Sequence, residues 1–454
     1  MQVSEAPATV SPRYAYGISA AAALAGLLFG FDTAVINGAL VFLKQQWGWT
    51  DPQLEAAAGA LLVGCLSGSG MAGSITDRWG RRKVLIAAAL GFCVSSVWTA
   101  LPHGLAEFIA ARFCAGLAIG VASVLAPMYI AEVAPPSLRG RLVTLNQMAI
   151  VTGIVLSYFV NWLLSGLGES SWRWMFATAT IPSVGFLLAL LRIPESPRWL
   201  VSRQRPEEAE SILARIGGPA EAQRQMEEIR DSLRKECGSI WTLFRPPMRH
   251  PLLLGVVLAV FSQVTGINTV LYYGALLFQQ HGGRSGASDA IGANVLIGLV
   301  NFAMTIAAIA WVDKLGRRPL LLGGIAGMIV ALVALCYSFT LQPPPANLIL
   351  GTVLLYVASF AVSLGPGTWL YLSEIFPTEV RGRAMSVATL SLWSACTLVT
   401  MTFLSLTSRL GPAGAFGLYT AMCVGAWIFI FFLLPETKGR TLEEISRSWS
   451  RRKN

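Results

Sequence analysis

Charged residues are scarce in this sequence of 454 residues. Asp, Glu, Lys and Arg together make up 13% of it, about half of the ~25% that is usual for soluble domains. Hydrophobic residues make up 54%, and the mean hydropathy is +0.59. Such a chain is too apolar to be disordered, and it is too poor in charge for the several soluble domains that its length would suggest. The composition favours a membrane protein.

The residues that build metal, redox or nucleotide sites are also few. Seven cysteines include no CxxC pair, and the three histidines, His103, His250 and His281, form no ligand pattern. No lysine follows a glycine, so the phosphate-binding loop of an ATP-driven pump is absent. We therefore expect no metal, no cofactor and no enzymatic activity, and we expect the cysteines to pack as small buried hydrophobes.

Long apolar runs separated by short polar breaks are what the sequence has instead. Most of them exceed the about 20 residues that cross a bilayer. The predicted fold is all-α, with twelve transmembrane helices. The predicted spans are 14–43, 54–76, 84–101, 105–131, 142–165, 172–192, 251–281, 287–312, 319–341, 346–373, 384–408 and 412–434.

The basic residues predict the orientation of these spans. If the N-terminus is cytoplasmic, 29 of the 34 Lys and Arg residues lie in segments on the cytoplasmic side. This bias places both termini in the cytoplasm. It also accounts for the net charge of +10 without a nucleic-acid partner. We expect a multi-pass protein of the plasma membrane, which would be the inner membrane in a bacterium.

Three motifs occur twice, at offsets of 236, 242 and 241 residues. Each copy follows the second, fourth or sixth span of its half, so the chain is predicted to be two six-helix halves with the same orientation. Parallel repeats of this kind are typical of transporters whose substrate site lies between the halves. The motif pairs are Asp77-Arg-Trp-Gly-Arg-Arg82 with Asp313-Lys-Leu-Gly-Arg-Arg318, Glu132–Arg141 with Glu374–Arg383, and Pro194-Glu-Ser-Pro with Pro435-Glu-Thr-Lys.

The predicted organisation is an N-terminal half (1–192), a cytoplasmic helical linker (193–250), a C-terminal half (251–434) and a cytoplasmic tail (435–454). Residues 205–217 and 221–236 in the linker, and 437–449 in the tail, have helical periodicity. They are predicted to form short cytoplasmic helices under the bundle, with a plain linker as the alternative.

Five motifs together resemble the signatures of the sugar porter family, which belongs to the major facilitator superfamily. The resemblance covers nearly the whole chain, and the motifs stand in order on the expected spans. They are Asp77-Arg-Trp-Gly-Arg-Arg82, Pro194-Glu-Ser-Pro-Arg-Trp-Leu200, Gln263-Val-Thr-Gly-Ile-Asn268, Asp313-Lys-Leu-Gly-Arg-Arg318 and Pro435-Glu-Thr-Lys-Gly-Arg440. The resemblance implies a secondary active transporter that imports a monosaccharide with a proton by alternating access.

Asp32 in the first span and Arg112 in the fourth are the two ionisable residues well inside the predicted spans. They lie about 16 Å and about 11 Å from the outer ends of their helices, so an ion pair is feasible. Burial favours the protonated form of Asp32 and Arg112 favours the ionised form, as proton coupling requires. By resemblance, proton-coupled sugar porters carry this Asp and Arg, whereas passive facilitators of animals usually carry an amide in place of the Asp. A static salt bridge is the alternative.

A sugar site needs amides and hydroxyls for hydrogen bonds and aromatic faces for the sugar's C–H surfaces. Gly266 and the Gly365-Pro-Gly367 run are able to unwind their helices, which is tolerated where the backbone lines a cavity. Gln263 and Asn268 share a face only if the helix bends between them. By resemblance, the sugar contacts are Phe29, Gln147, Gln263, Asn268, Tyr272, Asn301, Trp369 and Trp393.

Two positions depart from the family pattern. Ser262 stands where the family usually has a glutamine, and Leu392 stands where Asn or Gln is common. The loss of two long amides leaves the identity of the sugar open. We expect Ser262→Gln together with Leu392→Asn to strengthen hexose binding or to widen the range of substrates.

Acidic and basic residues at the inner helix ends repeat in the same order in both halves. Together with the resemblance, this order predicts a salt-bridge network between the halves that closes the inner side when the outer side is open. Positive-inside bias combined with helix capping is the alternative. The predicted gate residues are Asp77, Arg81, Arg82, Glu132, Arg139, Arg141, Glu195, Asp313, Arg317, Arg318, Glu374, Arg381, Arg383 and Glu436.

Two other functions stay open at this point. A passive sugar facilitator would use Asp32 as a structural anion only. A transporter-like sugar sensor would normally have a long signalling tail, whereas 20 residues follow Leu434. The expected partners are a monosaccharide, a proton and the lipid bilayer, and we expect a monomer.

Overall fold

The computed structural model describes residues 12–135, 138–235, 243–246, 248–281, 286–376 and 380–438. Every regular element in these ranges is a helix, as expected for an all-α fold. Within them, eleven segments are long and apolar enough to cross a membrane. The twelfth transmembrane helix of the fold is α17, which carries two arginines and several Ser and Thr residues and is therefore less apolar.

The helices follow the predicted order. Those of the N-terminal half are α1 (Pro12–Trp47), α2 (Asp51–Trp79), α3 (Arg81–Ala100), α4 (Leu105–Val133), α5 (Arg139–Leu164), a 3-10 turn (Ser165–Leu167), α6 (Ser171–Thr178) and α7 (Thr180–Leu190). Between the halves lie α8 (Pro197–Ser202), α9 (Pro206–Gly217) and α10 (Pro219–Lys235). Those of the C-terminal half are α11 (Arg249–Val264), α12 (Ile267–His281), α13 (Ala287–Leu315), α14 (Arg317–Thr340), α15 (Ala346–Val362), α16 (Leu364–Ile375), α17 (Arg381–Thr400) and α18 (Phe403–Leu433).

The short helices α9 and α10 coincide with the two linker segments that have helical periodicity. Pro206 and Pro219 start them, because a proline in the first turn of a helix loses no hydrogen bond there. The third segment with this periodicity, 437–449, lies outside the described residues from 439 onward.

The eleventh span ends earlier than predicted. It was expected over 384–408, but α17 stops at Thr400 and α18 begins at Phe403. The polar break near residue 410 is instead a kink inside α18, where Gly411 has φ +71° and is followed by Pro412. Glycine adopts this left-handed backbone without strain, and proline cannot donate the helical hydrogen bond.

The seventh and tenth spans, which carry the candidate glycines, both break, although only the seventh breaks at a glycine. Between α11 and α12, Gly266 has φ +91°, so the expected bend at this residue is present. The second break lies at Ser363, between α15 and α16. The Gly365-Pro-Gly367 run stays helical in the first turn of α16, because the N–H that Pro366 lacks would have no partner inside the helix there.

Helices of the same half pack closely along glycine contacts. A Cβ atom on Gly64 of α2 would lie 2.3 Å from the Phe113 carbonyl oxygen of α4, and one on Gly30 of α1 would lie 1.9 Å from the Ile150 carbonyl oxygen of α5. Small residues at such crossings let the backbones approach, which is how helices associate in membranes.

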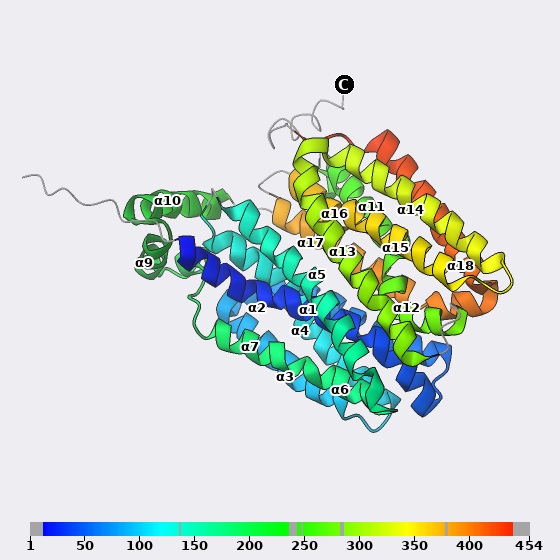
Figure 1. The fold of residues 1–454 in the computed structure, drawn as a ribbon. Helices are drawn as coiled ribbons and strands as arrows, with labels where there is room; N and C mark the ends of the chain where they lie inside the picture. Colours follow the sequence, from blue (N-terminus) through cyan, green and yellow to red (C-terminus); the bar gives the residue numbers. More distant parts are fainter. Residues whose placement is uncertain are drawn as a thin grey trace, which may run out of the picture.

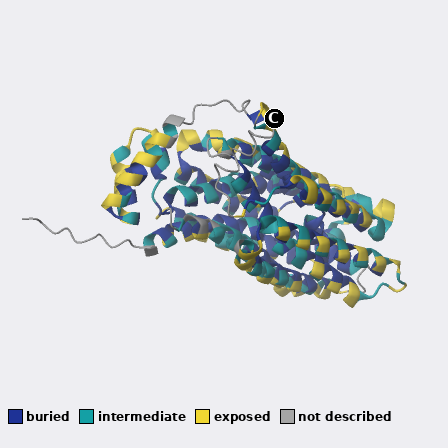
Figure 2. Cartoon of the chain, turned by 90° about the horizontal axis from the view of Figure 1, so that it is seen from above, coloured by how far each residue is buried: buried dark blue, intermediate teal, exposed yellow. Residues whose placement is uncertain are grey.

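The two halves meet along α5 and α13, α2 and α17, and α1 and α12. Figure 1 shows them diverging toward the end of the molecule that carries α9 and α10. We call the end with α8–α10 and the α2–α3 and α13–α14 connections the basic end, and the other the opposite end. Buried residues concentrate in the interior of the bundle, whereas exposed residues line its outer faces and α9–α10 (Figure 2).

Candidate functional site

Asp32 and Arg112 form an ion pair in the interior of the N-terminal half. The Arg112 Nη1 atom lies 3.0 Å from Asp32 Oδ1, and its Nη2 donates to the Asp32 carbonyl oxygen at 3.2 Å. Arg112 is 0% exposed and Asp32 is 5% exposed. In the described part of the chain, Asp32 Oδ2 has no hydrogen-bond partner. One carboxylate oxygen is thus paired with the guanidinium, and the other has no hydrogen-bond donor among the described residues.

Phe29 of α1 and Trp393 of α17 join the two halves through an aromatic contact. Their ring centroids lie 5.6 Å apart in an edge-to-face arrangement. The Trp393 indole is 4% exposed, and its Nε1 has no hydrogen-bond partner among the described residues. A buried indole N–H normally finds a partner, so this donor can serve a bound ligand. Phe29 lies three residues before Asp32, on nearly the same face of α1.

The break at Gly266 brings Gln263 and Asn268 together. Asn268 Nδ2 donates to Gln263 Oε1 at 2.6 Å, which the 140° separation on a straight helix would prevent. Asn268 Nδ2 also lies 3.1 Å from Cys396 Sγ on α17. Tyr272 follows one turn later on α12 and is buried. The C-terminal half therefore presents two linked amides in one place.

The remaining three candidates for sugar contact lie on three other helices. Gln147 lies on α5, Asn301 on α13 and Trp369 on α16. No hydrogen bond in the described part of the chain joins the Gln147 or Asn301 side chain to the other candidates. Trp369 is 37% exposed, in contrast to Trp393. As sugar contacts, all eight candidates stay predictions of the sequence.

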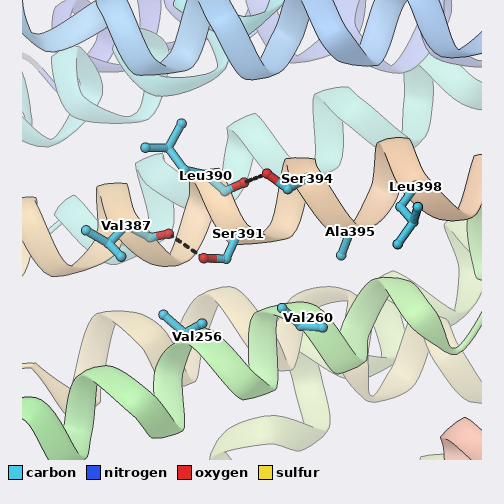
Figure 3. A pocket seen from close by; sticks show the side chains of 8 residues that line it. All are labelled: Val256, Val260, Val387, Leu390, Ser391, Ser394, Ala395 and Leu398. Atoms are coloured by element: carbon cyan, nitrogen blue, oxygen red, sulfur yellow. Dashed lines mark hydrogen bonds between the residues drawn. The ribbon is translucent and has the colours of Figure 1, made fainter.

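An apolar groove of about 480 Å³ lies between α11 and α17 (Figure 3). Its two hydroxyl groups are taken, because Ser391 donates to the Val387 carbonyl and Ser394 to the Leu390 carbonyl, each at 2.9 Å. The other lining side chains are Val, Leu and Ala. A sugar needs several free donors and acceptors, so this groove does not fit one.

Comparison with known proteins settles the family. The family model described as "Sugar (and other) transporter" matches residues 18–449. The chain belongs to the sugar transporter family. This membership confirms a multi-pass membrane transporter with the major facilitator fold, and not an enzyme.

The sugar transporter is similar to characterised relatives along almost its whole length. It is 37% identical to the arabinose-proton symporter of Bacillus subtilis (strain 168), over 95% of this chain and 94% of that protein. It is also 37% identical to the D-xylose-proton symporter of Escherichia coli (strain K12), over 96% of both chains. The inward-open conformation of the E. coli xylose transporter matches its fold with a TM-score of 0.84 at 35% identity, over 96% of this chain and 100% of that chain.

At the basic end of the transporter, the repeated motifs form the same structure twice. Glu195 accepts the backbone N–H groups of Arg81 and Arg82 at the start of α3, at 2.9 and 3.0 Å. Glu436 accepts those of Arg317 and Arg318 at the start of α14, at 3.1 and 2.9 Å. Each glutamate thus caps a helix N-terminus, where negative charge is favoured.

The capping glutamate Glu436 is held in its ionised form. Burial raises its pKa, but hydrogen bonds from the backbone N–H groups of Lys438, Arg318, Arg317 and Thr437 outweigh burial and lower the pKa overall. A carboxylate that accepts several backbone N–H groups is stabilised as the anion.

A second repeated contact crosses each half. Arg81 Nε lies 3.1 Å from Glu132 Oε2, and Arg317 Nη2 lies 2.9 Å from Glu374 Oε1. Hydroxyl groups support both carboxylates, because Ser196 donates to Glu132 at 2.5 Å and Thr437 donates to Glu374 at 2.6 Å. These ion pairs lie within one half, so the network between the halves stays a prediction for a state with the basic end closed.

The other predicted gate residues surround these pairs. Asp77 Oδ1 lies 3.5 Å from Arg81 Nη1, and its side chain is mostly exposed. Arg141 and Arg383 lie on the first turns of α5 and α17. The side chains of Arg139, Asp313 and Arg381 lie outside the described part of the structure.

The opposite end is held together by contacts between the halves. Asn37 of α1 donates to the Leu271 carbonyl of α12 at 2.7 Å, and its Oδ1 accepts the Ala275 N–H at 3.1 Å. Tyr158 of α5 donates to the same Leu271 carbonyl at 2.8 Å. The Asn37 amide thus bridges two groups of α12 one turn apart and binds this helix to the N-terminal half.

Glu55 of α2 makes the other main contact at the opposite end. It accepts the backbone N–H of Ser405 at 2.8 Å and the Ser405 hydroxyl at 2.6 Å, and it is 3% exposed. Ser405 lies in the first turn of α18, so a carboxylate of one half caps a helix of the other.

Sequence reasoning missed Asn37, Glu55, Tyr158 and Cys396. Glu55 lies at the edge of the second predicted span, where a charged residue is common and gives little signal of a buried contact. Asn37 was a polar residue in the apolar first run, and a buried amide needs partners, so its position was a signal. Tyr158 and Cys396 carry no such signal, because either residue packs as readily in an apolar core.

Proposed function

We propose that this transporter imports a monosaccharide together with a proton by alternating access. Two of its relatives are named as an arabinose-proton and a D-xylose-proton symporter, which supports a pentose or a related sugar as cargo. The observation that carries the proposal is the position of the buried Asp32–Arg112 pair, three residues along α1 from Phe29, which packs on Trp393 of the other half. The proton site and the wall of the sugar site therefore share one helix.

In the proposed cycle, Asp32 is protonated from the outside and releases the Arg112 side chain, because a neutral carboxyl no longer attracts the guanidinium. Sugar binds between the halves, the halves rock, and the basic end opens. Asp32 then loses its proton, and the pair with Arg112 forms again. The structure combines this pair with contacts that hold the opposite end together, which is the combination that the cycle assigns to the state after proton release.

We propose further that the basic end faces the cytoplasm, in the plasma membrane or in the inner membrane of a bacterium, and that one chain is the working unit. The positive-inside bias supports this orientation. The division into halves at 1–192 and 251–434, with a linker at 193–250 and a tail at 435–454, belongs to the same proposal. The sugar contacts and the closing network at the basic end are part of it.

The test is uptake of labelled arabinose and xylose by proteoliposomes with an inward proton gradient. We expect accumulation above the external concentration, and we expect a protonophore to abolish it. Uptake that equilibrates and ignores the gradient would show a passive facilitator with Asp32 as a structural anion. Absence of uptake and of counterflow for any sugar in a panel of pentoses, hexoses, polyols and inositols would contradict sugar transport and favour a sensor.

A further inference from the structure

A chain of hydrogen bonds runs through the amide pair of the C-terminal half. Ser262 Oγ donates to the Ala259 carbonyl at 2.7 Å, and Gln263 Nε2 donates to Ser262 Oγ at 3.0 Å. Asn268 Nδ2 then donates to Gln263 Oε1 at 2.6 Å and to Cys396 Sγ at 3.1 Å. The chain begins on α11, crosses the break at Gly266 and ends on α17.

The residues at the two ends of this series of hydrogen bonds are buried. Ser262 and Cys396 are each 2% exposed. Cys396 follows Trp393 by three residues on α17, so its thiol and the unpaired indole N–H lie on nearly the same face of that helix. Ser262 is hydrogen-bonded to Gln263 and Cys396 lies one turn from Trp393, so each end adjoins a candidate sugar contact.

The Ser262 hydroxyl determines the direction of every hydrogen bond in this series. Its single hydrogen is used on the Ala259 carbonyl, as is common for serine in a helix. Ser262 Oγ must then accept from Gln263, so the Gln263 amide turns its NH₂ group toward Ser262 and its oxygen toward Asn268. Asn268 in turn uses one N–H on Gln263 and the other on the weakly accepting Cys396 sulfur.

The fixed direction decides which atoms remain for a ligand. Asn268 keeps its Oδ1 as an acceptor, and Gln263 keeps one N–H as a donor. An amide that turns freely can exchange its donor and acceptor to suit a ligand, and an amide that is held at both ends cannot. A sugar hydroxyl in the wrong configuration would leave one of these buried groups unpaired, which weakens binding.

We propose that Ser262 and Cys396 are positioning residues that hold Gln263 and Asn268 in one orientation and thereby set which sugar epimers the site accepts. This inference rests on the proposed function. Ser262 then acts through Gln263 and not by direct contact with sugar. The family usually has a glutamine at this position. Serine here removes one amide side chain, and it also adds selectivity among sugars by fixing the orientation of Gln263.

The test compares affinities for pairs of epimers that differ at one hydroxyl, measured by calorimetry on purified protein. Ser262→Ala and Cys396→Ala should each lower the ratio of the two affinities by roughly 3–10-fold, because one hydrogen bond no longer fixes the amides. Cys396→Ser should restore the wild-type ratio, since the serine oxygen accepts the same N–H. The control is Cys423→Ala, which removes an equally buried thiol on α18 that lies outside the chain of hydrogen bonds.

Melting temperatures identify variants that fail to fold, and Ser262→Ala keeps the test decisive if Cys396→Ala fails. Wild-type epimer ratios in folded Ser262→Ala and Cys396→Ala would overturn the inference. An equal change in Cys423→Ala would also overturn it, because the effect would then come from packing. If the wild-type protein binds no monosaccharide, the proposed function falls and the inference falls with it, whereas binding with unchanged selectivity overturns the inference alone.

Discussion

Single residues decide the chemistry of this transporter, and the sequence shows some of them more clearly than others. Asp32 and Arg112 could be paired from their depths alone, because a charge inside an apolar helix needs a partner at the same level. Gln263 and Asn268 could be paired only conditionally, since their contact depends on the backbone of Gly266. Cys396 could not be found, because a thiol gains its role only from the helix that packs against it.

The unpaired indole of Trp393 leads to a prediction at this scale. Trp393→Phe keeps a ring against Phe29 but removes the N–H donor. We expect sugar binding to weaken by about 1 kcal/mol, the value of a single hydrogen bond, with little change in folding stability. Isothermal titration with the transported sugar measures the loss.

Trp427→Phe is the matched control for this change, because Trp427 stacks on Phe431 within α18 and should leave the affinity unchanged. An affinity of Trp393→Phe equal to that of the wild type would mean that the indole N–H does not face the ligand.

At the scale of helices, most boundaries could be predicted, and the exceptions have physical causes. Apolar runs located the spans, and the proline residues at 206 and 219 marked the starts of α9 and α10. The end of α17 was misplaced because the run 401–408 is apolar enough to continue a span, while Gly411 and Pro412 kink the next helix instead of separating it. The break at Ser363 could not be located from the sequence, because the residue at the break is neither a glycine nor a proline.

Gly80 carries a prediction for the basic end. It has φ +91°, and a Cβ atom there would lie 2.4 Å from Glu195 Oε2, the group that caps α3. Gly80→Ala should destabilise the protein by about 1–3 kcal/mol, because the backbone is strained and the capping carboxylate is displaced.

Thermal unfolding in detergent measures this loss, with Gly73→Ala as the control. A Cβ atom on Gly73, inside α2, meets nothing within 4 Å, so that variant should melt at or above the wild-type temperature. Equal melting temperatures for Gly80→Ala and the wild type would contradict the capping role of Glu195.

The contact between Glu55 and α18 carries a prediction for the opposite end. Glu55→Ala removes a carboxylate that caps α18 from the other half, which should weaken closure of this end by about 1–2 kcal/mol. Spin labels at the exposed positions Glu169 and Arg409, one in each half, should then show a larger population of long distances.

Gln53→Ala is the control for Glu55. Its side chain serves the capping box at the start of α2 and makes no hydrogen bond to α18 among the described residues. A distance distribution for Glu55→Ala that matches the wild type and Gln53→Ala would show that this contact does not hold the halves together.

At the scale of the whole molecule, the repeat was the most informative feature of the sequence. Motifs at a common offset predicted two like halves, and the structure shows the same cap and the same ion pair in each, at Glu195 and Glu436 and at Arg81–Glu132 and Arg317–Glu374. Which end is held closed could not be predicted. A transporter that alternates between two states has one sequence for both states. The difference in free energy between them is small, because it depends on only a few contacts.

If Asp32 couples sugar movement to a proton, Asp32→Asn should separate the two. An asparagine resembles the protonated carboxyl permanently, so the variant should bind and exchange sugar but lose accumulation against a gradient. The control is Asp51→Asn, which changes a partly exposed carboxylate paired with Lys44 at the opposite end and should leave accumulation intact.

The measurement is uptake of labelled sugar into proteoliposomes under an inward proton gradient, beside counterflow without a gradient. We expect Asp32→Asn to retain counterflow and to fail to accumulate sugar, while the wild type and Asp51→Asn accumulate it. Accumulation by Asp32→Asn at the wild-type level would show that Asp32 is not the coupling residue and would place proton coupling elsewhere in the chain.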